Sequence, residues 1–199
     1  MKIFTFLSLV FFAFIFNSTL SAQDNKSEAI SGWSKGNQNG KIRLEVFNDY
    51  QCPSCAIFNK KLKIFEGKYL SDLHLTFRHF PLMVIHDKAL LAAQAVEAAG
   101  IQGRFWEISD LILEKQQKWS GKKSARKSFI KYAKNLGLDS KKFKSDLESQ
   151  SVKNKIEADI ERGKSLSLTG TPTVFLNGRE LNFPELDELE KLAIEILSK

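Results

Sequence analysis

Apolar side chains at every second position mark the first patterned part of the chain. Residues 42–46 alternate apolar and polar side chains, and residues 73–78 do the same. This spacing predicts two β-strands. Between them, over residues 55–66, apolar side chains recur at helical spacing, and Gly67 is expected to end that helix. The pattern therefore predicts a strand, a helix and a second strand.

Helical spacing dominates the middle of the chain, and strands return after it. Five periodic segments follow, at residues 86–99, 103–117, 125–136, 140–149 and 152–166, and Gly100, Gly121 and Gly137 lie between the first four. Residues 173–176 have strand character, Asn177-Gly178 is a type I′ hairpin signal, and residues 179–181 can pair back. Pro184 is expected to open a last helix. This order predicts an α/β core that is split by a helical insertion.

Residues 1–22 have the pattern of a secretory signal peptide. Lys2 precedes an apolar run over residues 3–16, and Ser21-Ala22 offers small residues for cleavage. The run is shorter than the roughly 20 apolar residues of a membrane span, so an uncleaved anchor is the weaker alternative. We therefore expect an exported protein, in a periplasm or another extracytoplasmic space, with no stable membrane insertion after cleavage.

The remainder is predicted to be one domain. Residues 23–40 are a polar lead-in, and residues 41–199 form the domain, with its helical insertion at about 84–168. The 30 Lys and Arg residues outnumber the 23 Asp and Glu residues but are spread along the chain. The densest basic run, residues 115–127 around Trp119, is interpreted as a solvated loop. No nucleic-acid-binding motif occurs, so we expect no nucleic acid partner.

The chain has only two cysteines, Cys52 and Cys55, and they are three residues apart. Stray thiols are a liability in an oxidising compartment, so a single close pair in an exported protein points to a reactive pair. A purely structural disulfide is the alternative. Closing so short a loop removes little chain entropy from the unfolded state, so such a bond would stabilise poorly.

Cys52 stands where a strand ends and a helix begins. Backbone N–H groups and the helix dipole favour a thiolate there, so Cys52 is the expected nucleophile. Cys55 lies one turn further along and is expected to be more buried and to resolve mixed disulfides. Pro53 and Ser54 are expected to tune the redox poise, since Pro53 removes an N–H and Ser54 adds a neutral hydroxyl. Without a cation between the cysteines, we expect a moderate oxidant.

A zinc site is the main alternative use of this pair. Structural zinc needs four Cys or His ligands, and the two candidates at suitable spacing, His74 and His79, have opposite parity on the expected strand. Attached haem would need a histidine after Cys55, where the chain has Ala56. We therefore expect no metal and no cofactor.

A second motif, residues 170–173 with the sequence Gly-Thr-Pro-Thr, directly precedes the late strand. Proline is tolerated at a strand start. A cis peptide is a minority state for proline in general, but its pairing with a CxxC motif favours cis here. Thr171 would then offer backbone groups to an extended substrate beside Cys52. Thr171 and Pro172 are thus the expected substrate-binding residues.

Three blocks of sequence together resemble the DsbA-like branch of the thioredoxin superfamily. They are residues 49–55, residues 79–82 with 103–106, and residues 170–178. The resemblance implies a thioredoxin fold with a helical insertion between the CxxC half and the cis-proline half. It also implies that the protein introduces disulfide bonds into cysteine-containing exported polypeptides. Its implied partner for reoxidation is a quinone-linked membrane thiol oxidase.

Two other functions remain open. An exported reductase or isomerase of the same fold differs in redox poise, which sequence determines poorly. A non-catalytic peptide-binding chaperone would use the groove beside Pro172 without any thiol chemistry.

The chain departs from the family at one position. Many members carry a buried acid six residues before the first cysteine, where this chain has Val46. Glu45 precedes it, and strand alternation places Glu45 on the opposite face, so the usual proton acceptor is expected to be missing. His79 and His86 are interpreted as scaffold residues.

Overall fold

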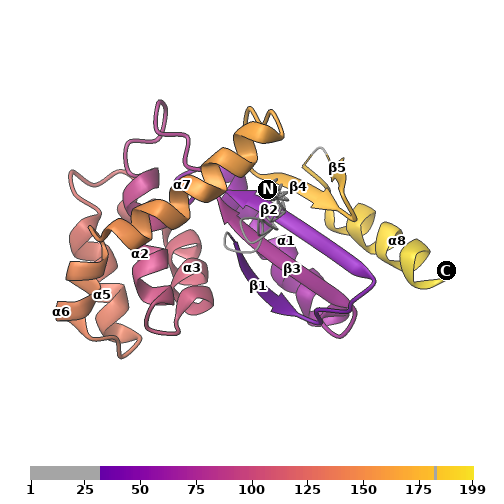
Figure 1. Ribbon diagram of the computed structural model, residues 1–199, viewed down its shortest axis with the longest axis horizontal. Helices are drawn as coiled ribbons and strands as arrows, with labels where there is room; N and C mark the ends of the chain where they lie inside the picture. The colour runs from indigo at the N-terminus through magenta and orange to yellow at the C-terminus, as the bar shows by residue number, and fades with distance from the viewer. Residues whose placement is uncertain (1–31, 182) are drawn as a thin grey trace, which may run out of the picture.

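The computed structural model describes residues 32–181 and 183–199. Its centre is a five-stranded sheet with the strand order β1-β3-β2-β4-β5 (Figure 1). The strands are β1 Trp33–Gly36, β2 Ile42–Asn48, β3 Leu73–His79, β4 Thr173–Leu176 and β5 Arg179–Leu181. The predicted signal peptide at residues 1–22 lies outside the described residues.

The strand directions follow from the connections. Helix α1, Pro53–Tyr69, crosses between β2 and β3, which therefore pair in parallel. Strand β4 runs antiparallel to β2 and forms a hairpin with β5 through Asn177 and Gly178, which both have positive φ. Strand β1 pairs antiparallel with β3 at the other edge. This arrangement confirms the predicted α/β thioredoxin fold.

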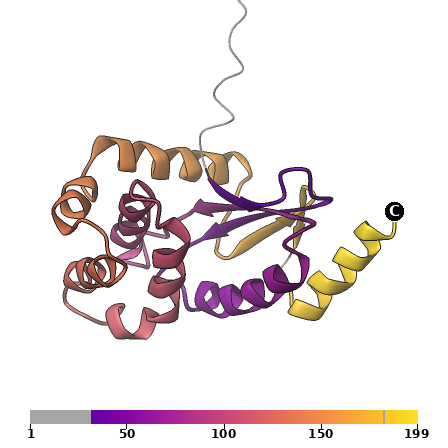
Figure 2. The same ribbon diagram turned by 90° about the horizontal axis from the view of Figure 1, so that it is seen from below.

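Helices lie on both faces of the sheet. Helix α1 and the last helix, α8 Leu186–Leu197, lie on one face, and helix α7, Gln150–Ser165, runs along the other (Figure 2). Every third or fourth residue of α1 is buried: Cys55, Phe58, Leu62 and Phe65. The inner face of this helix therefore begins with the second cysteine.

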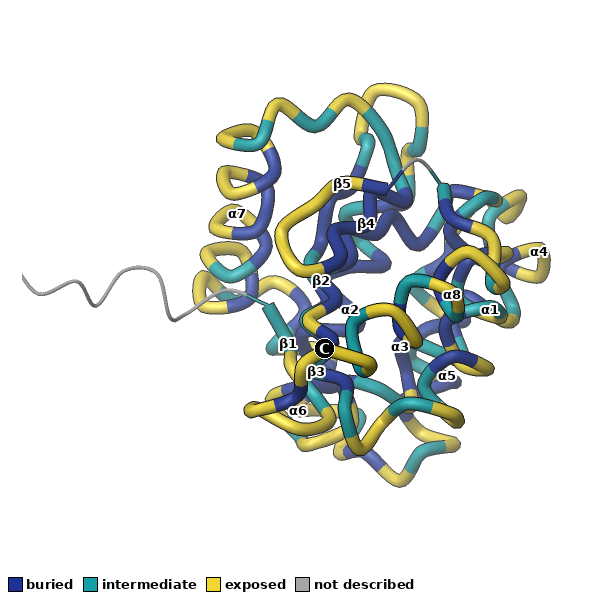
Figure 3. The backbone as a smooth tube through the Cα atoms, turned by 90° about the vertical axis from the view of Figure 1, so that its right-hand side faces the viewer, coloured by how far each residue is buried: buried dark blue, intermediate teal, exposed yellow. Residues whose placement is uncertain are grey.

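The helical insertion lies between β3 and β4, as predicted. Its helices are α2 Ala89–Gly100, α3 Phe105–Glu114, α4 Gln116–Trp119, α5 Arg126–Asn135, α6 Ser140–Asp146 and α7. Helix α2 packs against α3, α5, α6 and α7. Its small alanine side chains are buried and let these neighbours approach, whereas the outer side of α7 is exposed (Figure 3). None of the helices in the described residues is long and apolar enough to cross a membrane.

One buried polar centre joins the sheet to this insertion. Glu97 of α2 accepts hydrogen bonds from Trp33 Nε1 at 2.7 Å and from His79 Nε2 at 2.8 Å. The side chains of Glu97 and His79 are each 1% exposed, and Lys155 of α7 lies 3.3 Å from the second carboxylate oxygen. Strands β1 and β3 and helices α2 and α7 therefore meet at one carboxylate.

Several predicted boundaries were wrong for identifiable reasons. The polar lead-in contains β1, an edge strand whose packing depends on Trp33 and on Lys35, whose ammonium lies 4.1 Å from the centre of the Trp106 ring. Gly67 does not end α1: it is not among the glycines with positive φ, and the helix continues to Tyr69. Helix α8 begins at Leu186, two residues after Pro184.

Candidate functional site

A tight turn presents the two cysteines at the end of β2. Asp49 accepts hydrogen bonds from the backbone N–H groups of Gln51 at 2.7 Å and Cys52 at 3.3 Å. These bonds hold the turn that precedes the first helical residue, Pro53. Cys52 occupies the N-cap of α1 in an extended conformation, and Pro53 takes the first helical turn. The structure thus places Cys52 where the sequence predicted, at the start of a helix.

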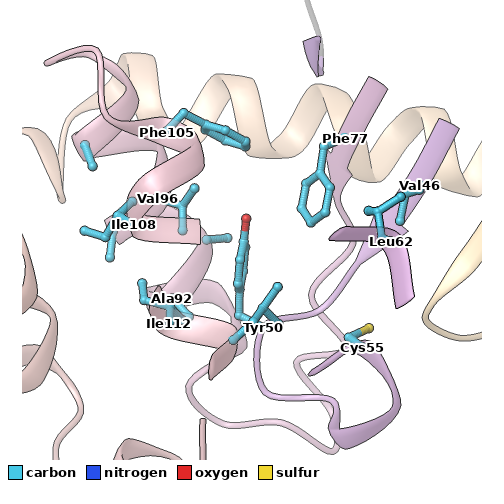
Figure 4. Close-up of a cluster of buried hydrophobic side chains, with 14 of the residues drawn as sticks. Val46, Tyr50, Cys55, Leu62, Phe77, Ala92, Val96, Phe105, Ile108 and Ile112 are labelled. Carbon is cyan, nitrogen blue, oxygen red and sulfur yellow. The ribbon is translucent and has the colours of Figure 1, made fainter. Parts of the chain in front are cut away.

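The two sulfurs have different surroundings. Cys52 is 7% exposed and Cys55 is 0% exposed, and both are free thiols in this structure. Figure 4 shows Cys55 at the edge of the buried cluster that includes Val46, Leu62 and Tyr50. The prediction that the second cysteine is the more buried one is therefore correct.

Hydrogen bonding favours the thiolate of Cys52. The thiol of Cys55 donates to the Cys52 sulfur, and this contact outweighs the opposing effect of burial. The backbone N–H groups of Cys55 and Ser54 and the hydroxyl of Thr171 add to it, and the pKa of Cys52 falls to about 5. For Cys55, burial, the hydrogen bond to Cys52 and the negative charge of the Cys52 thiolate together raise the pKa well above its ordinary value. The geometry therefore separates the pair into a thiolate and a thiol.

Alkylation should expose this separation directly. In the reduced native protein we expect iodoacetamide to modify Cys52 with a pH midpoint near 5, because the thiolate is the reactive form. Cys55 should stay unmodified at pH 6. Mass spectrometry of tryptic peptides measures both, and the urea-denatured protein is the control, where both midpoints should return to about 8.5. Preferential labelling of Cys55 in the native protein would contradict the assignment.

The late proline motif lies beside Cys52, although it is far away in the sequence. The peptide between Thr171 and Pro172 is cis, as the sequence analysis favoured. The Cys52 thiol donates to the carbonyl oxygen of Thr171 at 3.3 Å. The buried hydroxyl of Thr171 has no hydrogen-bond partner among the described residues while Cys52 is a thiol, so it is free to donate to a Cys52 thiolate. The structure thus joins the two motifs in one site.

A groove runs from Ser54 along this motif. Its volume is 360 Å³, and its lining residues come from the start of α1, the cis-proline segment and the β5 side of the hairpin: Ser54, Thr169, Gly170, Thr171, Pro172, Thr173, Glu180, Leu181 and Phe183. Thr171 and Ser54 therefore face a space that can accept a peptide next to the reactive sulfur.

Sequence reasoning missed Gln116. This residue lies in the basic run that was interpreted as a solvated loop, but residues 116–119 form α4, and Trp119 is fully buried. The Gln116 side-chain amide donates to the backbone carbonyls of Tyr50 and Cys52, each at 2.8 Å. It therefore braces the active-site turn from the insertion. Gln116 and Gln117 lie side by side in the sequence, and no local signal distinguishes the buried one.

Sequence reasoning also missed the partner of Asp49. His86, interpreted as scaffold, lies with its Nδ1 atom 2.7 Å from the Asp49 carboxylate.

The prediction that strand alternation places Glu45 on the face opposite Val46 was correct, since Glu45 pairs with Arg78 on that face of the sheet. His74 and His79 lie on opposite faces of β3, as expected. In the described part of the chain, no cluster of three or more His, Cys, Asp or Glu side chains could hold a metal ion.

Comparison with known proteins supports the fold. A family model described as Thioredoxin matches residues 28–195. Among solved structures, oxidised BdbD from Bacillus subtilis superimposes with a TM-score of 0.74 and 22% identity, covering 83% of this chain and 92% of that chain. The α-DsbA1 protein of Wolbachia pipientis superimposes with a TM-score of 0.75 and 17% identity, covering 86% of this chain and 96% of that one.

Curated relatives match at higher identity but are much longer. The Na(+)/H(+) antiporter NhaA 3 of Salinispora tropica is 30% identical over 164 residues, which are 82% of this chain and 24% of that protein. NhaA 1 of Mycolicibacterium gilvum is 31% identical over 154 residues, or 75% of this chain and 24% of that protein. The chain thus spans about a quarter of the length of these relatives.

Proposed function

The chain belongs to the thioredoxin family, with a DsbA-like fold, and from this premise we propose that it introduces disulfide bonds into exported proteins through Cys52 and Cys55. Its substrates are cysteine-containing exported polypeptides. A quinone-linked membrane thiol oxidase reoxidises it, and it works in a periplasm or another extracytoplasmic space.

One observation carries the proposal, namely the low pKa of Cys52, about 5, beside a buried Cys55 thiol. A stable Cys52 thiolate stabilises the reduced form of the pair. It also makes Cys52 a good leaving group. Both effects favour donation of the disulfide over its retention, and so an oxidase over a reductase.

The reaction consists of two exchange steps. A substrate thiolate attacks the Cys52 sulfur of the Cys52–Cys55 disulfide, forming a mixed disulfide, and the released Cys55 sulfur takes up a proton. A second thiolate of the same substrate attacks the substrate sulfur of the mixed disulfide and expels Cys52 as a thiolate. The substrate loses two electrons and the pair gains two. The Thr171 carbonyl oxygen, 3.3 Å from the Cys52 sulfur, belongs to the backbone that aligns the extended substrate.

The reduction potential of the pair tests the direction of this reaction. We expect a value between about −180 and −120 mV, the range of disulfide-donating members of the superfamily. Equilibration in a series of glutathione buffers, read by the gel shift of alkylated thiols, gives the value. Cys55→Ser, which cannot form the internal disulfide, is the control. A potential below about −240 mV would instead make the protein a reductant and refute the proposed direction.

A further inference from the structure

Asp49 is the buried carboxylate of the active-site turn, with a side chain that is 0% exposed. Oδ1 accepts from the N–H groups of Gln51 and Cys52. Oδ2 accepts from the Leu82 N–H at 2.8 Å and lies 2.7 Å from His86 Nδ1. Because a carboxylate only accepts hydrogen bonds, this imidazole nitrogen must carry the hydrogen.

Asp49 touches both cysteines. Its carboxylate accepts from the Cys52 N–H at 3.3 Å, and its own N–H donates to the Cys55 sulfur at 3.4 Å. Val46, which is 0% exposed, contributes no charge to this part of the core. The buried carboxylate of the turn therefore contacts the backbone of Cys52, and the backbone of Asp49 contacts the Cys55 sulfur.

The partner of this carboxylate comes from another segment of the chain. His86 lies between β3 and α2, where the insertion begins, and its side chain is 16% exposed. Its neighbours Asp87 and Lys88 pair with each other at 2.7 Å and also bind the side chain of Gln51. Asp87 and Lys88 are thus paired with each other, whereas the Asp49 carboxylate is bound by the Nδ1–H group of His86.

The hydrogen bonding of the Asp49 carboxylate matters for Cys52. A carboxylate close to a thiol opposes formation of the thiolate by like-charge repulsion, and a donor that binds the carboxylate weakens that repulsion. In a buried site the effect is larger than in water, because the local dielectric is low. His86 therefore lies where it can alter the reactivity of Cys52 without touching it.

We propose that His86 is a positioning residue for the Cys52 nucleophile and acts on it through Asp49. The imidazole draws the negative charge of the carboxylate toward the insertion and holds Oδ1 on the N–H groups of the turn. The Cys52 thiolate then faces less repulsion. The assignment builds on the proposed redox function of the pair, but Cys52 reactivity can be measured without any protein substrate.

A double-mutant cycle tests this role. His86→Ala is expected to slow iodoacetamide alkylation of Cys52 at pH 5 about two- to fivefold, because stronger repulsion from Asp49 leaves less of Cys52 as the reactive thiolate. Asp49→Asn removes the repelling charge, so adding His86→Ala to it should cause no further slowing. His86→Gln keeps an N–H donor and should recover most of the rate. His86→Leu, of similar volume, serves if the alanine variant does not fold.

The controls separate this role from a structural one. His74→Ala changes a half-buried histidine of β3, on the face of the sheet opposite His79, and should leave Cys52 alkylation unchanged. A purely structural His86 would lower the thermal midpoint while the pH profile of Cys52 stays the same, and that result overturns the proposal. Equal slowing in the Asp49→Asn background also overturns it. A low reduction potential would refute the oxidase role alone, so the two failures are distinguishable.

Discussion

Replacing Cys52 with serine is expected to abolish disulfide exchange, whereas Cys55→Ser should still form a mixed disulfide with a disulfide-bonded peptide but fail to resolve it. Cys52 is the sulfur that lies beside the groove and the Thr171 carbonyl, and its thiolate is the stabilised one. Removing a nucleophile that forms a covalent intermediate costs at least about a thousandfold in rate. Oxidation of a reduced two-cysteine peptide, followed by mass spectrometry, measures the loss.

The trapping variant has its own signature. Cys55→Ser cannot form the Cys52–Cys55 disulfide, so it forms a mixed disulfide only when its Cys52 thiolate attacks a substrate disulfide and expels one substrate thiolate. The missing Cys55 thiol then cannot resolve this mixed disulfide. Incubated with a disulfide-bonded peptide, the Cys55→Ser variant should accumulate adducts that reducing agent releases, and the Cys52→Ser variant should accumulate none. Adducts on Cys55 instead, or full peptide oxidation by Cys52→Ser, would contradict the assigned roles.

A Cys52→Ala variant that still suppressed aggregation of unfolded polypeptides would favour the chaperone alternative.

The elements with strong periodicity could be predicted from sequence. Strands β2, β3 and β4 have apolar side chains on the core face, and α1 repeats them every three to four residues. Strand β1 could not be found, because its position depends on pairing with β3, more than 35 residues away, and not on its own pattern. Pairing with β3 makes this polar segment a strand, although its own sequence does not favour one.

The site divides in the same way. Cys52 and Cys55 are three residues apart in sequence, a spacing typical of a redox pair, so they could be identified from the sequence. Gln116 and His86 reach the active-site turn only because the insertion folds back on it. Nothing in their neighbouring residues indicates this contact. Long-range hydrogen bonds to backbone groups leave no periodic signal, which is why the supporting residues of the site required the structure.

Removing the carboxylate of Glu97 should have the largest effect on stability. Glu97 accepts hydrogen bonds from Trp33 and His79 at a site where both members of the Glu97–His79 pair are 1% exposed. Breaking such a buried pair by removing one partner costs about 3–5 kcal/mol. We expect Glu97→Ala to lower the free energy of unfolding by about 3 kcal/mol in urea titrations at pH 7.

The matched control is Glu107→Ala. Glu107 pairs with Arg104 at the surface, where the two side chains are 41% and 51% exposed. Exposed pairs contribute about 0–1 kcal/mol, so this variant should differ little from the parent protein. A loss for Glu97→Ala no larger than that for Glu107→Ala would show that the polar centre does not hold the insertion to the sheet.

The pH dependence of stability follows from the same carboxylate. Burial alone would raise the pKa of Glu97, but the His79 hydrogen bond and the charges of His79 and Lys155 outweigh it and lower the pKa. A carboxylate with a lowered folded-state pKa stabilises the fold fully above its unfolded-state value of about 4.3. This stabilisation is lost as the pH falls through the folded-state pKa. In urea titrations between pH 7 and pH 3, the free energy of unfolding should therefore fall more steeply for the parent protein than for Glu97→Gln. The variant has no carboxylate at this position that could take up a proton.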